Sequence, residues 1–193
     1  MVNAFRSIKG WVASGFLAIT LMTSGSVVAQ EKEYTDVDWV ALMPASDLDA
    51  LMNRPRFINE IADGSEQDNL EAIYGNQEDK ALNEYYSALQ STKVIEKFDG
   101  AAVRLPGFIV PLEMTDDQTV TEFFIVPYFG ACLHMPPPPP NQIIHVEFKD
   151  GIDLPNLSDA YFFEGTLGLE VESNDLGTSA YKMNLDNLMP YYE

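Results

Sequence analysis

The sequence predicts a mainly β protein with some α-helix: a five-stranded antiparallel OB-like barrel or coiled sheet, preceded by a helical N-terminal segment. Two observations carry this prediction. Apolar residues recur at helical spacing before Gly100 and at every second position after it. The later half also contains five short runs of strand-forming residues, with Gly107 in the first and Gly165 and Gly168 in the fourth, which permit strong coiling of a short sheet. The competing architecture is a two-layer sandwich of helices on an open antiparallel sheet.

The first 29 residues have the three parts of a secretory signal peptide. Arg6 and Lys9 precede an apolar run, WVASGFLAITLM, which is shorter than the roughly 20 residues that span a bilayer. Val27 and Ala29 suit the small-residue cleavage site. We therefore expect a periplasmic mature protein that does not span the membrane, organised as a signal peptide (1–29), an acidic helical segment packing on the barrel (30–99) and a barrel-like domain (100–193).

The mature chain is strongly acidic. Removing Arg6 and Lys9 leaves 9 basic residues against 30 acidic ones, a formal charge of −21. Nucleic-acid binding requires Lys and Arg to neutralise phosphates, so this composition argues against it. Cations, or basic patches on another protein, are the partners that such a surface attracts.

The segment before Gly100 contains two expected helical stretches. Ser46 is the predicted N-cap of a first helix, which Pro55 interrupts and residues 57–61 resume. The polar run 63–78 is expected to be an exposed loop, and a second helix is expected over 79–97. The five strands are predicted at 103–112, 121–128, 142–148, 161–170 and 179–185.

The stretch GACLHMPPPPPNQ, residues 130–142, lies between the second and third predicted strands. Cys132 is the only cysteine, so it forms no internal disulfide; it is a packed thiol, an intermolecular partner, a metal ligand or a nucleophile. The five prolines favour a stiff polyproline segment of about 15 Å. Because residues two apart point to the same side of an extended chain, we expect the Cys132 sulfur and the His134 ring to converge.

These residues also carry a family resemblance. GFIVPLE (107–113), the run from 123 to 146 and YFFEGTLGLE (161–170) resemble the bacterial domain of unknown function 3299 family. Cys132, His134, the prolines, Asn141 and Gln142 match its pattern, whereas His145 is not part of it. The resemblance implies an exported protein, encoded near ABC-type export or metal-linked transport components. It implies no established activity.

Cys132, His134 and His145 are the candidate metal ligands, with the Met135 thioether nearby. This combination favours zinc or copper over calcium or magnesium. Alternation along the third strand places Ile144, Val146 and Phe148 on one face and Ile143, His145 and Glu147 on the other. The alternative for Cys132 and His134 is a packed or hydrogen-bonded pair with an inert thiol.

Two functional hypotheses follow. The first is a non-catalytic periplasmic accessory protein that serves an ABC-type transporter or another envelope protein, through a bound transition metal. The second is a thiol-dependent enzyme or redox protein centred on Cys132, activated by His134. No spacing singles out a general acid, a general base or a cofactor site, so the non-catalytic hypothesis is preferred.

Overall fold

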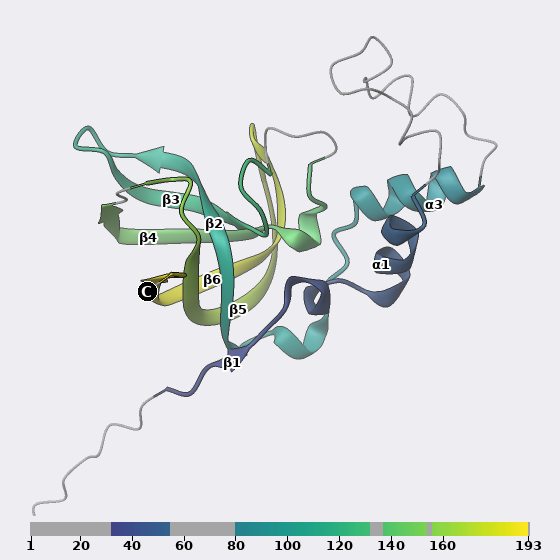
Figure 1. Ribbon diagram of the computed structural model, residues 1–193, viewed down its shortest axis with the longest axis horizontal. Coiled ribbons are helices and arrows are strands. Elements are labelled where there is room, and N and C mark those ends of the chain that lie inside the picture. Colours follow the sequence, from purple (N-terminus) through teal and green to yellow (C-terminus); the bar gives the residue numbers. More distant parts are fainter. Residues whose placement is uncertain (1–31, 55–79, 132–136, 154–155, 193) are drawn as a thin grey trace, which may run out of the picture. The chain divides into compact units, whose positions relative to one another are not determined.

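Five long strands close into a barrel in the computed structural model, which describes residues 32–54, 80–131, 137–153 and 156–192 (Figure 1). The sheet order is β1-β2-β3-β4-β6-β5, and an additional β2–β5 pairing closes it. Strand β2 pairs with β5 as far as Gly107 and with β3 from Phe108, so it bends from one side of the barrel to the other. The strands are β1 (Thr35–Asp36), β2 (Ala102–Met114), β3 (Thr119–Val126), β4 (Ile144–Asp153), β5 (Tyr161–Asn174) and β6 (Gly177–Pro190).

All five predicted strands are present, but the prediction of a purely antiparallel sheet is wrong. Strand β4 pairs in parallel with β6 through Ile144–Tyr181 and His145–Lys182, and the short strand β1 runs parallel to β2 outside the barrel. The connection between β4 and β6 is strand β5, which pairs with the other edge of β6 and with β2. Closure therefore places two strands of the same direction side by side without a helical crossover.

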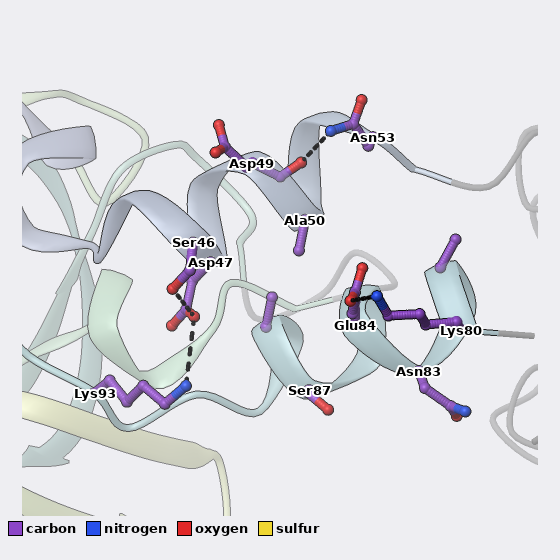
Figure 2. A pocket seen from close by; sticks show the side chains of 12 residues that line it. Ser46, Asp47, Asp49, Ala50, Asn53, Lys80, Asn83, Glu84, Ser87 and Lys93 are labelled. Carbon is purple, nitrogen blue, oxygen red and sulfur yellow. Dashed lines mark hydrogen bonds and ion pairs between the residues drawn. The ribbon is translucent and has the colours of Figure 1, made fainter.

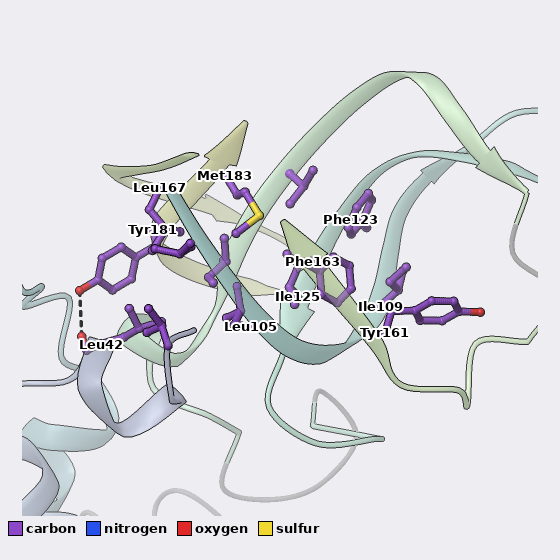
Figure 3. Close-up of a cluster of buried hydrophobic side chains, with 14 of the residues drawn as sticks. Leu42, Leu105, Ile109, Phe123, Ile125, Tyr161, Phe163, Leu167, Tyr181 and Met183 are labelled. Carbon is purple, nitrogen blue, oxygen red and sulfur yellow. Dashed lines mark hydrogen bonds between the residues drawn. The ribbon is translucent and has the colours of Figure 1, made fainter. Parts of the chain in front are cut away.

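The barrel interior is filled by alternate residues of these strands. Burial alternates along β2 and β5, where Leu105 and Phe163 are fully buried. The Phe123 and Phe163 rings lie 6.3 Å apart, in the tilted geometry that aromatic pairs favour. Figure 3 shows this barrel core, whose labelled members are Leu42, Leu105, Ile109, Phe123, Ile125, Tyr161, Phe163, Leu167, Tyr181 and Met183.

One bend of the barrel requires a glycine. The register of β5 against β6 shifts between Glu164 and Gly165. A Cβ atom at Gly165 would lie 2.5 Å from the carbonyl oxygen of Asn184, closer than real Cβ contacts allow. The strong coiling expected from the glycines of this strand is thus present, because the backbones of β5 and β6 approach closely at Gly165.

The two α-helices among the described residues precede the barrel in the chain. Helix α1 (Ala45–Met52) starts after Pro44 rather than at the predicted N-cap Ser46, whose hydroxyl instead donates to Asp47. Helix α3 (Lys80–Leu89) is shorter than the predicted 79–97, since the β-branched residues Thr92, Val94 and Ile95, which have low helix propensity, follow it outside any helix. Leu82, Tyr85 and Tyr86 form its own apolar cluster. The expected helix at 57–61 and the loop at 63–78 lie outside the described residues.

Helical turns are not confined to the segment before the barrel, contrary to the prediction. The part of the chain that the structure describes has the 3-10 helices η1 (Trp39–Leu42), η3 (Glu96–Phe98) and η4 (Pro140–Gln142), and η4 lies between β3 and β4. The last proline of the run, Pro140, occupies the first position of η4, which its fixed φ favours. None of the helices in these described segments is long and apolar enough to cross a bilayer.

Hydrogen bonds attach the residues before β2 to the barrel. The Tyr181 hydroxyl donates to the Leu42 carbonyl oxygen at 2.8 Å and accepts from the Ile95 N–H at 2.8 Å. Burial is the main cause that raises the pKa of Tyr181, although the Ile95 hydrogen bond acts in the opposite direction. The Trp39 indole N–H donates to the Pro106 carbonyl oxygen at 2.7 Å. The N-terminal segment is therefore fastened at both β2 and β6.

Candidate metal-binding site around His145

Strand β4 alternates as predicted. Ile144 and Val146 are fully buried in the barrel core, and Phe148 packs against that core. Ile143 belongs to a second apolar cluster with Phe124, Val126 and Ala131, on the opposite side of the same strands. His145 follows Ile143 on this outer face, and only 4 % of its surface is exposed. The outer face of β3 and β4 is therefore covered rather than open to solvent.

His145 has a carboxylate at each ring nitrogen. Its Nε2 lies 2.9 Å from Oε1 of Glu122, and its Nδ1 lies 2.8 Å from Oε2 of Glu172. The Phe124 ring meets the imidazole edge-on, with 6.0 Å between the centroids. Two acidic side chains thus fix the ring in its plane, and an aromatic side chain packs against it.

The two carboxylates come from strands that are far apart in the sequence. Glu122 lies on β3, next to β4, where Phe124 and His145 are direct cross-strand partners. Glu172 lies near the end of β5, and Gly177 at the start of β6 reaches the same outer face. A Cβ atom at Gly177 would lie 3.7 Å from the Phe124 ring and 3.9 Å from the Ile143 side chain. The β5–β6 hairpin therefore covers this face and brings Glu172 to His145.

Ser179 adds an unpaired oxygen on the same hairpin. It is the cross-strand partner of Glu172, so the two side chains lie on the same face of the β5–β6 ribbon. Ser179 is fully buried, and its Oγ has no hydrogen-bond partner among the described residues. Buried hydroxyl groups are nearly always hydrogen-bonded, so an unpaired one needs an explanation.

One nitrogen and two oxygens in this arrangement are suitable donors for a divalent cation. One ligand atom from each of Glu122, His145 and Glu172 lies within 4.8 Å of the other two. Imidazole and carboxylate are both common zinc ligands. Glu147, which shares the outer face with His145 in the predicted alternation, is exposed and does not belong to this cluster.

Of the three predicted ligands, the structure describes one. His145 lies in the cluster, whereas Cys132 and His134 lie outside the described residues, as does Met135. The predicted convergence of the Cys132 sulfur and the His134 ring therefore remains a prediction. Sequence reasoning missed Glu122 and Glu172. Alternation along the second predicted strand places Glu122 on the same face as Phe124, but no spacing pairs Glu172 with His145, because only barrel closure brings them together.

Asn141 and Gln142, at the end of the proline signature, have a structural role. The Asn141 side-chain amide donates to the Lys93 carbonyl oxygen at 3.1 Å and to the Asp47 carboxylate at 3.4 Å. The Gln142 amide donates to the Trp39 carbonyl oxygen at 2.8 Å. Both residues are buried, and together they attach η4 to the segment that precedes the barrel.

A pocket of about 690 Å³ lies between α1 and α3 (Figure 2). Several of its charged side chains are paired within it: Lys80 lies 3.4 Å from Glu84, and Lys93 lies 3.9 Å from the buried Asp47. In Figure 2 the Asp47 carboxylate points toward both Ser46 and Lys93. This pocket therefore contains ion pairs at a helix–helix contact and lacks the buried imidazole that distinguishes the outer face of the barrel.

Comparison with known proteins places the chain in a family. Residues 39–190 match the family described as protein of unknown function (DUF3299). The chain belongs to the DUF3299 family. It is also similar to the crystal structure of a DUF3299 family protein from Pseudomonas aeruginosa PAO1, with 30 % identity and a TM-score of 0.58. That match covers 84 % of this chain and 99 % of the other. Comparison with curated proteins gives no match.

Proposed function

We propose that this protein is a non-catalytic accessory protein of the periplasm that binds a divalent transition metal. The observation that carries the proposal is the environment of His145, a buried imidazole with carboxylate oxygens 2.8–2.9 Å from both nitrogens. One of those carboxylates, Glu172, has a side chain that is 42 % exposed. A site with solvent-exposed ligands suits reversible loading, whereas structural zinc sites are closed.

Zinc fits this cluster better than copper. The expectation of copper depended on the Cys132 thiol and the Met135 thioether, which are soft ligands. The cluster around His145 offers imidazole nitrogen and carboxylate oxygen, which zinc accepts and cuprous copper does not favour. The formal charge of −19 adds a field that attracts cations from solution.

An OB-type assignment of the barrel supports a binding role. The barrel has five strands, and its third and fifth strands are parallel neighbours, β4 and β6. OB-type barrels bind ligands over strands two and three and with the loop between strands four and five. Glu122 and His145 lie on the corresponding strands, β3 and β4, and Glu172 lies just before the β5–β6 turn. This argument is an analogy of fold and supports the location of the site, not its ligand.

The family resemblance adds the cellular role to the proposal. A metal-loaded exported protein encoded near ABC-type transport components would deliver its ion to a transporter or to another envelope protein. The acidic surface suits a partner that presents basic side chains.

Zinc titration of the mature chain, residues 30–193, tests the proposal. We expect calorimetry and metal analysis to give one zinc per chain, and His145→Gln to weaken binding by more than about 100-fold, beyond the loss typical of an outer-shell residue. Glu147→Gln removes one negative charge from the same strand and serves as the matched control with unchanged affinity. Absence of zinc binding, or binding unaffected by His145→Gln, would contradict the proposal. If zinc does not bind, or if His145→Gln does not affect its binding, rapid alkylation of Cys132 near neutral pH would favour a thiol-dependent protein.

A further inference from the structure

The two carboxylates cannot play the same part in a metal site. The nitrogens of an imidazole ring lie on different edges, so one ion cannot coordinate both of them. Glu122 lies at the Nε2 edge and Glu172 at the Nδ1 edge. A metal-bound histidine almost always donates its other N–H to an acceptor, commonly a carboxylate, which fixes the tautomer and the ring orientation. One glutamate therefore serves as a ligand, and the other serves as a positioning residue.

We propose, resting on the zinc-binding function above, that the ion binds at the Nδ1 edge of His145 together with Glu172, while Glu122 holds the ring through Nε2–H. The first argument is the movement that binding requires. With zinc–ligand distances of about 2.0–2.1 Å and tetrahedral angles, the nitrogen and oxygen lie about 3.3 Å apart. The Nδ1–Glu172 distance is 2.8 Å, so the ligand carboxylate must move outward.

Glu172 is the carboxylate that has room to move. Its side chain is 42 % exposed, whereas that of Glu122 is 25 % exposed. Glu172 also lies near the end of the β5–β6 hairpin and is the first paired residue after a shift in the strand register. Glu122 lies on β3 between β2 and β4 and pairs with both. A carboxylate fixed in the middle of the sheet suits positioning, and one near a hairpin end suits reversible coordination.

Ser179 provides an independent second observation at the same edge. Its fully buried Oγ has no partner among the residues that the structure describes, and its side chain shares a ribbon face with that of Glu172. A water bound to zinc at the Nδ1 edge would give this hydroxyl the hydrogen bond that it lacks. Zinc at the Nε2 edge would leave it unpaired.

The ion then bridges the barrel and its hairpin. His145 belongs to β4, and Glu172 belongs to β5, which has no direct pairing with β4. Zinc bound between these two side chains therefore adds a link between β4 and the β5–β6 hairpin. The loaded and empty proteins would differ in how tightly the hairpin is held against Phe124 and Ile143, a difference that a partner protein can recognise.

Nitrogen NMR of the two histidines in the zinc-loaded mature chain tests this inference. The His145 signal is assigned by its loss in His145→Gln. We expect zinc to shift Nδ1 of His145 as a coordinated nitrogen and to leave Nε2 protonated. We also expect Glu172→Gln to weaken zinc binding by more than about 100-fold, and Glu122→Gln to weaken it by 10- to 100-fold with loss of the single tautomer, as for outer-shell partners of other zinc sites.

A variant that is expected to bind zinc more tightly is needed as well, because misfolding could also cause the loss of zinc binding in the glutamate variants. Ser179→Cys places a thiolate beside Glu172, its cross-strand partner, and should tighten zinc binding at the Nδ1 edge, whereas Glu147→Gln should leave it unchanged. Coordination through Nε2, or a larger loss in Glu122→Gln than in Glu172→Gln, would overturn the edge assignment while leaving the zinc proposal standing. An unchanged His145 spectrum in saturating zinc would show an ion pair only, and both proposals would fall.

Discussion

The interior and the outer face of the barrel are built by the same strands, yet they have different chemistry. On β3, Phe123 points into the barrel core and Phe124 points to the outer face, and both are fully buried. The described core side contains apolar groups and the rings of Tyr161 and Tyr181, whose hydroxyls are both paired. The outer side places an imidazole and two carboxylates beside apolar residues.

This contrast shows that burial alone does not identify a structural core. The interior is buried because the barrel closes, and closure is set by strand pairing. The outer face is buried because the β5–β6 hairpin lies over it, and the hairpin also brings Glu172. A polar cluster in the second environment keeps access to solvent through a half-exposed side chain, which the barrel core does not offer.

The largest expected effect is in the barrel interior. Phe163→Ala removes a fully buried ring that contacts Phe123, and we expect it to lower the free energy of unfolding by about 3–5 kcal/mol. Chemical denaturation of the metal-free protein measures this loss. Phe129→Ala, at a ring that is 55 % exposed, is the matched control and should cost far less. Equal losses in the two variants would contradict the distinction between interior and surface.

The next effect concerns the hydrogen bonds that join η4 to the helical segment. Asn141→Ala leaves the Lys93 carbonyl oxygen and the buried Asp47 carboxylate without their amide donor. We expect a loss of about 2–3 kcal/mol, because a hydrogen bond to a charged group contributes more than a neutral one. Zinc affinity should stay unchanged, since these residues do not touch His145; a parallel loss of affinity would show that the two regions are coupled.

Tyr181→Phe tests the polar group of the interior, with an expected loss of about 1–2 kcal/mol for two neutral hydrogen bonds. The effect depends on pH. Burial raises the pKa of Tyr181 above its ordinary value of 10.0, so above pH 10 the unfolded chain loses the proton first and the native protein loses stability. The variant lacks this contribution. Its stability should therefore decline less steeply above pH 10 than that of the wild type, as denaturation at several alkaline pH values would measure.

The smallest expected change in the free energy of unfolding is that of a substitution on the outer face of the metal-free protein. Glu172→Gln removes the half-exposed carboxylate that is paired with the buried His145, and we expect a change below about 1 kcal/mol in the presence of a chelator. Zinc at 100 times its dissociation constant should then stabilise the wild type by about 2.7 kcal/mol and the variant much less. Thermal unfolding with and without zinc measures both values, and equal stabilisation of the two proteins would argue against a ligand role for Glu172.

The pattern of the sequence predicts the strands because each has a local signal. Alternation of apolar residues marks β2 to β6, and the same alternation places Ile144 and Val146 inside the barrel and His145 outside it. The parallel pairing of β4 with β6 has no local signal. It follows from closure, which depends on contacts between β2 and β5 more than fifty residues apart.

The site is less predictable than the fold for the same reason. His145 and Glu147 share a strand face, so the sequence favours Glu147 as its neighbour. The structure places Glu122 and Glu172 there instead, one from the adjacent strand and one from a hairpin that returns over the face. Helix α3 is shorter than predicted: its apolar residues at helical spacing end at Leu89, and the Ile95 N–H bonds to the Tyr181 hydroxyl rather than to a helical turn.

The attachment of the N-terminal segment to the last strand has a consequence for the order of folding. Leu42 is bonded to Tyr181, 139 residues later, and Lys32 to Thr166, 134 residues later. While the chain is being made, the N-terminal segment can pair early with β2, through β1 and Trp39, but the partner of Leu42 on β6 emerges only when nearly the whole sequence has been made. Contacts of such sequence separation are costly to form and slow to find. The attachment of the N-terminal segment is therefore completed only by the last strand, and a chain shortened by that strand would lose the hydrogen bonds of Leu42 with Tyr181 and of Lys32 with Asp186.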